Sequence, residues 1–244
     1  MIAAGEIFAA WRDAPVCDLD EITGGWPALV LSPHPDDESL GFGGLIAESC
    51  ARGNGIEVAV LTDGTGSHPN SRNYPAVRLA KLRATETINA LTELGVGAEQ
   101  ITFLEAPDTR APHEGADFDE LASRLEGLVR KRGIRNILTS WRYDPHCDHE
   151  AAALLAAAVA DVTGARLINA PIWGWTLPED TQLPAPAPIA MRLDISAHLP
   201  AKRRAIAAHV SQLTDLIDDS PNGFRLEAKF LALFDRPWEV FLRT

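Results

Sequence analysis

The chain has 244 residues, of which 46% are hydrophobic and 23% are charged, which is typical of a globular protein with a sizeable core. The formal net charge of −12 opposes binding to nucleic acid and to anionic membranes. The sequence has no run of about 18 apolar residues that would predict a membrane span, and its start does not resemble a signal peptide. Three widely separated cysteines, Cys17, Cys50 and Cys147, indicate reduced thiols and a cytoplasmic protein.

From residue 6 to residue 170 the chain alternates between helical patterns and short apolar runs. Helices are predicted over residues 6–12, 40–52, 76–94, 117–132 and 149–161. Strands are predicted over residues 28–32, 56–62, 100–104, 135–140 and 167–170. In the longest helix, the apolar stripe expected to face the core comprises Val77, Ala80, Ala84, Ile88 and Leu91. This alternation predicts an α/β fold: a Rossmann-like open, mostly parallel sheet with helices on both faces.

The last third of the chain changes character. Residues 178–188 contain four prolines and are predicted to form an extended loop. A strand over residues 191–195, a helix over 198–216 and a final strand over 238–242 follow. We find no internal repeat and no clear domain boundary, and the tail is too small for a core of its own. The sequence therefore predicts a single domain.

Polar side chains crowd into the turn after the first predicted strand. His34, Asp36, Asp37 and Glu38 lie within five consecutive residues. The carboxyl ends of strands in an open α/β sheet are where ligands bind. Four such groups would repel one another unless a cation or tight hydrogen bonds held them together. The turn is therefore a candidate cation site.

A second polar cluster, residues 141–150, follows the fourth predicted strand and includes His146 and His149. If the two strands are neighbours in a parallel sheet, the two clusters meet. His34, Asp37 and His149 would then offer two imidazoles and a carboxylate, a set that leaves a position open for water at a catalytic zinc ion. The same set is also typical of non-haem iron oxygenases, and a metal-binding protein without catalysis is a further alternative.

The two clusters together resemble a known family. Pro33-His34-Pro35-Asp36-Asp37-Glu38 and the later His146-x-Asp148-His149 are similar to the motifs of the PIG-L/LmbE-like, zinc-dependent N-deacetylases. Weaker similarity is present in residues 83–86, 94–96, 107–108 and 236–241. The resemblance spans roughly residues 28–165, and it departs from the family pattern at Cys147, where a proline is common.

This resemblance implies a metal-dependent hydrolase that removes an N-acetyl or other N-acyl group from a small N-acetylglucosamine-type conjugate. His34, Asp37 and His149 would bind the ion, with Zn²⁺ expected and Fe²⁺ or another divalent ion as alternatives. It further implies one deacetylase domain over residues 1–244, with a catalytic core at about 28–165 and a C-terminal part that completes the sheet and the substrate pocket. Oligomeric state is left open.

The resemblance also implies catalytic roles. Asp36 would be the general base that acts on water, and His146 would polarise or protonate the tetrahedral intermediate. Asp148 would hold His146 in the correct orientation, and Glu38 would support the metal site from outside its ligand set. The cation and His146 could share the stabilisation of the oxyanion.

Substrate contacts are expected at Arg83, Asp108 and His68. For Arg83 the alternative is an i,i+3 pair with Glu86, and for His68 it is a solvated loop position. Further along the chain, residues 173–175 (Trp-Gly-Trp) are expected to be buried core, with an apolar wall for a sugar ring or acyl chain as the alternative. His113, His198 and His209 are expected to be structural or exposed.

Overall fold

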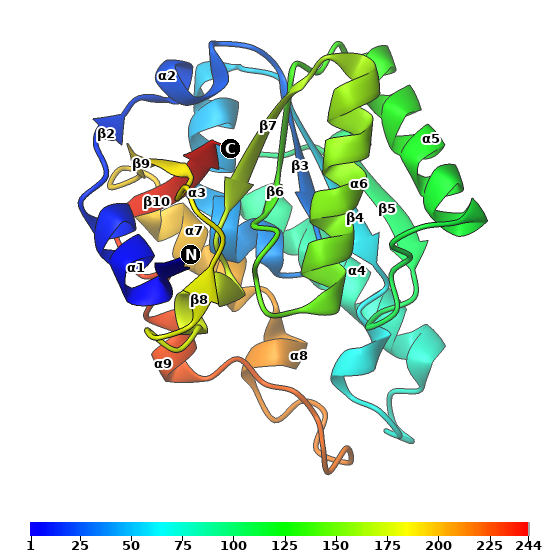
Figure 1. The fold of residues 1–244 in the computed structure, drawn as a ribbon. Coiled ribbons are helices and arrows are strands. Elements are labelled where there is room, and N and C mark those ends of the chain that lie inside the picture. The colour runs from blue at the N-terminus through cyan, green and yellow to red at the C-terminus, as the bar shows by residue number, and fades with distance from the viewer. Residues whose placement is uncertain (244) are drawn as a thin grey trace.

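The computed structural model describes residues 1–243, and its centre is an eight-stranded sheet (Figure 1). In spatial order the strands are β2 (Val16–Cys17), β9 (Ile189–Asp194), β10 (Trp238–Arg243), β7 (Arg166–Ala170), β6 (Asn136–Ser140), β3 (Ala28–Ser32), β4 (Ile56–Thr62) and β5 (Ile101–Ala106). The five strands from β7 to β5 are parallel, whereas β10 is antiparallel to both β7 and β9. A separate two-stranded sheet pairs β1 (Ile2–Ala3) with β8 (Gln182–Leu183).

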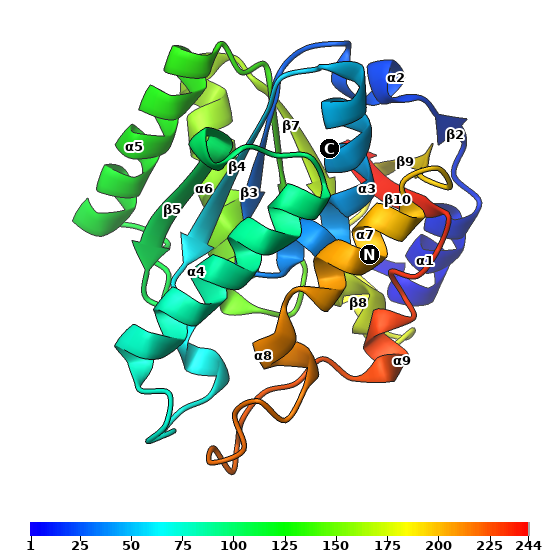
Figure 2. The same ribbon diagram turned by 180° about the vertical axis from the view of Figure 1, so that it is seen from behind.

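Helices cover both faces of the large sheet, as Figures 1 and 2 show from opposite sides. One face carries α5 (Ala116–Arg132) and α6 (Cys147–Thr163), and the other carries α3 (Asp37–Arg52), α4 (Ala76–Glu93) and α7 (Leu199–Ala207). Shorter helices are α1 (Ala4–Arg12), α2 (Leu19–Thr23), α8 (Val210–Leu213), α9 (Ala228–Leu231) and the 3₁₀ turns η1 (Thr65–Ser67), η2 (Ala98–Gln100) and η3 (Trp173–Thr176). The predicted α/β fold class is confirmed.

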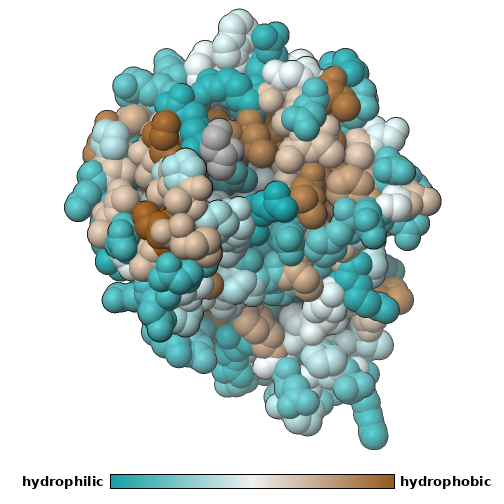
Figure 3. All heavy atoms as spheres, in the orientation of Figure 1, coloured by the Kyte–Doolittle hydropathy of each residue, from teal (hydrophilic) through white to brown (hydrophobic). Residues whose placement is uncertain are grey.

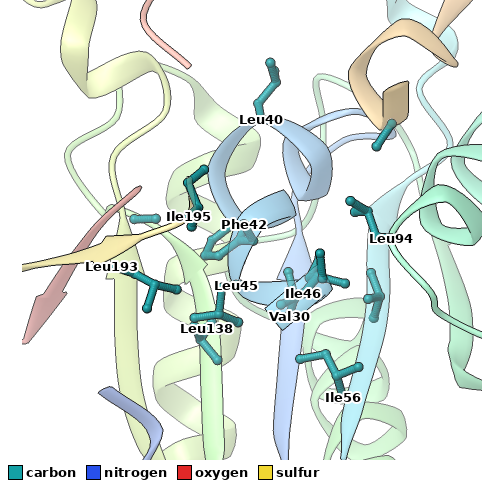
Figure 4. Packing of buried hydrophobic residues seen from close by; sticks show 14 of the residues in the cluster. Val30, Leu40, Phe42, Leu45, Ile46, Ile56, Leu94, Leu138, Leu193 and Ile195 are labelled. Carbon is teal, nitrogen blue, oxygen red and sulfur yellow. The ribbon is translucent and has the colours of Figure 1, made fainter. Parts of the chain in front are cut away.

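Strand β3 is buried on both faces, because alternate residues enter different cores. Val30 packs with Phe42 and Leu45 of α3 on one face of the sheet (Figure 4). Leu29 and Leu31 belong to the cluster beneath α5 and α6 on the other face. This explains why the strand is a continuous apolar run rather than an alternating one.

The predicted apolar stripe of the long helix α4 is only partly correct, because Leu91 is buried in the core but two other members are exposed. Val77 and Ile88 are 71% and 38% exposed, whereas Arg83 and Glu86 are 3% and 4% exposed. The buried side of α4 therefore carries charged groups, and each finds hydrogen-bond partners described below. A helical face that contacts polar loops and α8 does not have to be apolar, because buried polar groups are tolerated when they are paired.

Several boundaries also differ from the sequence prediction. Helix α3 begins at Asp37, three residues earlier than expected, and the predicted helix over 198–216 is divided into α7 and α8. The division falls at His209, whose ψ of 59° is not helical. Short elements such as β2, α2, β8 and α9 were not predicted, because segments of two to five residues carry too little periodicity.

Figure 3 shows one face of the molecule, on which hydrophilic side chains surround several apolar areas. Within residues 1–243, none of the helices is at once long and apolar enough to cross a membrane.

Candidate active site

The two polar clusters meet at the point where the order of the strands in the sheet reverses. From β3 the chain proceeds to β4 and β5 on one side, then returns to β6, which pairs with β3 on its other side. The loops after β3 and β6 therefore lie side by side at the carboxyl end of the sheet, which is the usual ligand site of such folds. The rings of His34 and His146 are 4.5 Å apart between centroids, and those of His34 and His149 are 5.3 Å apart.

Asp37 lies between the two histidines that were predicted to share a metal with it. Its Oδ2 is 3.1 Å from His34 Nδ1 and 3.1 Å from His149 Nε2. On the far side of each ring, His34 Nε2 lies 3.0 Å from Asp148 Oδ2 and His149 Nδ1 lies 3.0 Å from Asp144 Oδ2. In a neutral ring, an N–H donated to the outer carboxylate leaves the inner nitrogen with a free lone pair, which is the tautomer that binds a metal. Although burial opposes it, the neighbouring carboxylates raise the pKa of both rings, so each would release a proton when an ion binds.

The donor set fits a divalent ion. His149 is fully buried, and within residues 1–243 its Nε2 makes no well-oriented hydrogen bond, although Asp37 Oδ2 lies 3.1 Å away. Burial favours the neutral ring, but contact with Asp37 and Asp144 raises the pKa of His149 to about 9. The surrounding carboxylates thus stabilise positive charge at this position. The ring nitrogens of His34, His146 and His149 also lie within 4.8 Å of one another, so His146 is an alternative third ligand.

Asp144 is a functional residue that the sequence analysis missed. Its carboxylate accepts hydrogen bonds from His149 and from the backbone N–H groups of Ile172, Trp173 and Gly174, at 2.7–3.1 Å. It therefore joins a candidate metal ligand to the segment that follows β7. A general rule offered a signal: a metal-binding histidine usually donates its second N–H to a carboxylate, and Asp144 belongs to the same polar cluster.

Asp36 is held in an unusual backbone conformation at the start of α3. Its φ of 137° is disfavoured for a residue with a Cβ and costs about 1–3 kcal/mol. Glu38 Oε2 accepts the N–H of Asp36 at 3.0 Å, and Arg83 donates to its carboxylate at 3.1 Å. Burial raises the pKa of Asp36 to about 7, although Arg83 opposes that rise. Asp36 can therefore exchange a proton near neutral pH.

The segment around α8 fixes this arrangement from the C-terminal third of the chain. His209 donates through Nε2 to Glu38 Oε1 at 3.0 Å, and both side chains are buried. Two residues later, Ser211 donates through its N–H and hydroxyl to Glu86, at 2.7 and 2.6 Å. His209 was expected to be structural or exposed. The structure shows that it supports the residue that holds Asp36.

Replacing His209 by alanine should lower kcat about 10- to 100-fold, with little change in KM or in metal content. Glu38 would lose its partner and hold the backbone of Asp36 less firmly, and a displacement near 1 Å can cost about 100-fold in rate. His198→Ala is the matched control, because His198 contacts Glu48 and does not line the cavity. Equal losses of kcat in both variants, or loss of metal in His209→Ala, would contradict this positioning role.

The expected role of Asp148 needs correction. The structure shows no hydrogen bond between the carboxylate of Asp148 and the ring of His146. The carboxylate accepts hydrogen bonds from His34 Nε2 and from the N–H groups of Thr109 and Ala111. The backbone N–H of Asp148, rather than its side chain, donates to His146 Nδ1 at 3.2 Å. Burial and the neighbouring His34 and His149 lower the pKa of His146 to about 4. His146 is therefore a neutral ring with Nε2–H as its donor.

The residues around the ion site line a cavity of about 350 Å³. Its lining comprises His34, Asp36, Asp37, Leu40, Gly66, Ser67, Arg83, Asp108, Thr109, Pro145, His146, Trp173, Gln212, Phe224 and Leu226. This volume is at the lower end of the range for small-molecule sites.

The three expected substrate contacts differ in position. Arg83 and Asp108 line the cavity. Arg83 does not pair with Glu86 as the alternative proposed, because it donates to Pro35 O, Gly64 O and Asp36. His68 does not line the cavity. It is 5% exposed and lies against Ser67, so neither the substrate contact nor the solvated loop position is found.

The family model described as PIG-L, GlcNAc-PI de-N-acetylase, matches residues 29–160, which is more than half of the chain. The chain belongs to the PIG-L family. The matched range contains every residue of the two polar clusters described above. It ends before Trp173, His209 and Gln212, so the supporting contacts made by these residues lie outside it.

Named relatives are deacetylases. The 1D-myo-inositol 2-acetamido-2-deoxy-alpha-D-glucopyranoside deacetylase of Rhodococcus jostii is 29% identical over 241 residues, covering 76% of this chain and 81% of the relative. The N,N'-diacetylchitobiose deacetylase of Pyrococcus horikoshii has a TM-score of 0.59 at 24% identity, covering 78% of this chain and 72% of that one. The fold is also shared by a 4-carboxy-2-hydroxymuconate hydratase of Pseudomonas putida, with a TM-score of 0.58 at 21% identity and coverages of 77% and 80%. Fold alone therefore does not define the reaction.

Proposed function

We propose that this protein is a zinc-dependent hydrolase that removes an N-acetyl group from a small N-acetylglucosamine-type conjugate. His34, Asp37 and His149 are the proposed ligands of the ion. The observation that carries this proposal is that His34 Nδ1 and His149 Nε2 converge on one carboxylate oxygen of Asp37, at 3.1 Å each, in a buried site where Asp144 orients His149 from behind. Membership of the PIG-L family and the activities named for its relatives support the same reaction.

A bound divalent ion would activate water near neutral pH and polarise the carbonyl of the amide. Asp36, which lines the cavity beside Asp37, takes one proton from the attacking water as the new C–O bond forms. The pKa of Asp36, about 7, suits a group that must both accept and release a proton. As the C–N bond breaks, Asp36 returns that proton to the leaving nitrogen, which yields an amine and a carboxylic acid; the acid then loses the second proton of the water to solvent at neutral pH.

His146 has a different part in this scheme. Because its pKa is lowered to about 4, it is neutral at pH 7 and does not act as the proton donor to the amine. Its Nδ1 accepts the N–H of Asp148, which leaves Nε2–H to donate a hydrogen bond to the oxygen that becomes negative. This proposal replaces the expectation that His146 protonates the intermediate.

The oxygenase alternative is not favoured. Family membership opposes it, and an iron oxygenase would have no use for a buried carboxylate such as Asp36 beside its metal ligands. A hydratase remains a reaction class that the fold is known to host, so the assay must detect amide cleavage directly.

The test uses chelator-treated protein reloaded with Zn²⁺ or Fe²⁺ and a panel of N-acetylated amino sugars. We expect acetate and free amine to appear in equal amounts, loss of activity in the chelated protein, and recovery on addition of metal. Metal-dependent oxygen consumption without amine release would indicate an oxygenase. Absence of amine from every N-acyl substrate with the metal bound would overturn the proposed reaction.

A further inference from the structure

The cavity has two chemically different sides, and they come from different parts of the chain. Its charged and titratable lining residues all lie within residues 29–160: His34, Asp36, Asp37, Arg83, Asp108 and His146. The lining residues beyond residue 160 are uncharged: Trp173, Gln212, Phe224 and Leu226. The family-matched segment thus supplies the ion site and the base, while the C-terminal third supplies a different surface. We call Trp173, Phe224 and Leu226 the aromatic wall.

The aromatic wall is built into the fold. Trp173 stacks on Phe230 with a centroid distance of 4.1 Å and an interplanar angle of 20°, and it meets Phe224 edge-on at 5.9 Å. The backbone N–H of Trp173 donates to Asp144, the same carboxylate that orients His149. The N–H of Phe224 donates to Ser67 O at 2.6 Å. The wall is therefore fixed relative to the ion site before a ligand binds.

The composition of the wall limits what it can recognise. None of its members is charged, so it offers no partner for a phosphate or carboxylate. Phe224 lines the cavity and is 37% exposed, although aromatic side chains of this size usually gain by burial. Gln212 supplies a side-chain amide on this side of the cavity, but it is fully buried and donates to Ser211 Oγ at 3.0 Å, so it offers a polyol little to bind.

We propose that the aromatic wall binds an apolar alkyl or aryl group carried by the amino-sugar substrate. This inference rests on the proposed function and narrows its substrate class. The preferred substrate is an amino sugar with an apolar substituent, rather than the inositol conjugate named for the Rhodococcus jostii relative. The volume of about 350 Å³ suits one sugar ring with a short apolar group.

The apolar group could be the aglycone or the N-acyl chain, and two substrate series distinguish these sources. One series keeps the N-acetyl group and changes the aglycone from methyl to butyl to phenyl. The other keeps a methyl aglycone and changes the acyl group from acetyl to butyryl to hexanoyl. With zinc-loaded protein, we expect kcat/KM to rise by about tenfold or more along one series, since a methylene in an apolar site is worth about that much.

Phe224→Ala should abolish most of this preference, measured as the ratio of kcat/KM for the apolar substrate to that for its methyl or acetyl parent. Leu216→Ala is the control, because Leu216 is similarly exposed, at 40%, in the same region but does not line the cavity. Affinities for both series are also measured by calorimetry on the zinc-loaded Asp36→Asn variant, so that binding is recorded whether or not an amide is cleaved.

These measurements distinguish a failure of the proposed amide hydrolysis from a failure of the proposed role of the aromatic wall. Amide cleavage without an apolar preference in either series, or equal ratios in Phe224→Ala and Leu216→Ala, would overturn the role of the aromatic wall while leaving the hydrolase intact. Tighter binding of the apolar ligands, lost in a Phe224→Ala/Asp36→Asn double variant, would support the aromatic wall even if no amide were cleaved. In that case the proposed reaction alone would fail.

Discussion

Replacing His149 by alanine is expected to abolish binding of the divalent ion and, with it, amide hydrolysis. Three protein ligands are the usual minimum for a catalytic zinc site, so the loss of one leaves too few donors. The fold should survive the change. Asp144 keeps the backbone N–H groups of Ile172, Trp173 and Gly174 as partners, and the cavity left by the ring is bordered by polar groups. Metal content by elemental analysis and helical content by circular dichroism measure the two effects separately.

A graded set of variants tests the assignment of ligands. Asp144→Asn should weaken metal affinity by about 10- to 100-fold, because it removes the negative charge and leaves one acceptor oxygen for His149 and three backbone N–H groups. His146→Ala should retain the ion and lower kcat more than it raises KM, because it removes a contact made in the transition state. If His146→Ala loses the ion and His149→Ala keeps it, the two histidines are assigned the wrong way round, and His146 is the ligand. Loss of the ion in both variants would indicate the alternative set of three histidines.

The meeting of the two polar clusters could be predicted from the sequence because it depends on topology. Residues 28–32 and 135–140 were recognisable as buried parallel strands, and polar residues followed each of them. Once such strands are neighbours, as β3 and β6 are, their carboxyl ends must lie together. His34, Asp37 and His149 are therefore brought together by the order of the strands, without any need to know the loop conformations.

The contacts that hold the site residues in place could not be predicted from the sequence in the same way. His209 and Ser211 lie more than 100 residues from their partners Glu38 and Glu86, and no local pattern records those contacts. The partner of Asp148 was misjudged for a related reason. Proximity in sequence suggested His146, but in the first turn of α6 the side chain points toward the loop after β5 and toward His34. Residues two apart on a helix do not face each other.

The buried polar side of α4 shows how a functional site alters the sequence pattern. Arg83 and Glu86 occupy positions that would be apolar in a helix that only packs on a core. They form hydrogen bonds instead with the loop of Asp36 and with α8. The spacing of the apolar residues alone therefore does not show which side of the helix is buried. Conflicts between a local pattern and the fold are expected at such sites.

Replacing Asp36 by asparagine should lower kcat by about 10²–10⁴-fold, the usual contribution of a general acid-base group. The amide of asparagine cannot accept the proton of water, yet it retains the shape of the carboxylate and an oxygen that can accept from Arg83. The backbone should also be preserved, because asparagine tolerates a positive φ better than most residues and Asp36 has a φ of 137°. Metal content and KM should therefore remain close to those of the wild type.

The control for this change is Asp63→Asn, the same chemical substitution in the loop after β4. Asp63 accepts hydrogen bonds from Thr65 and does not line the cavity of the ion site, so its variant should keep kcat within a few-fold of the wild type. If Asp36→Asn keeps a comparable kcat with its metal bound, Asp36 is not the base. Asp108 would then be the next candidate, because it is a second carboxylate in the cavity and is not a proposed ligand of the ion.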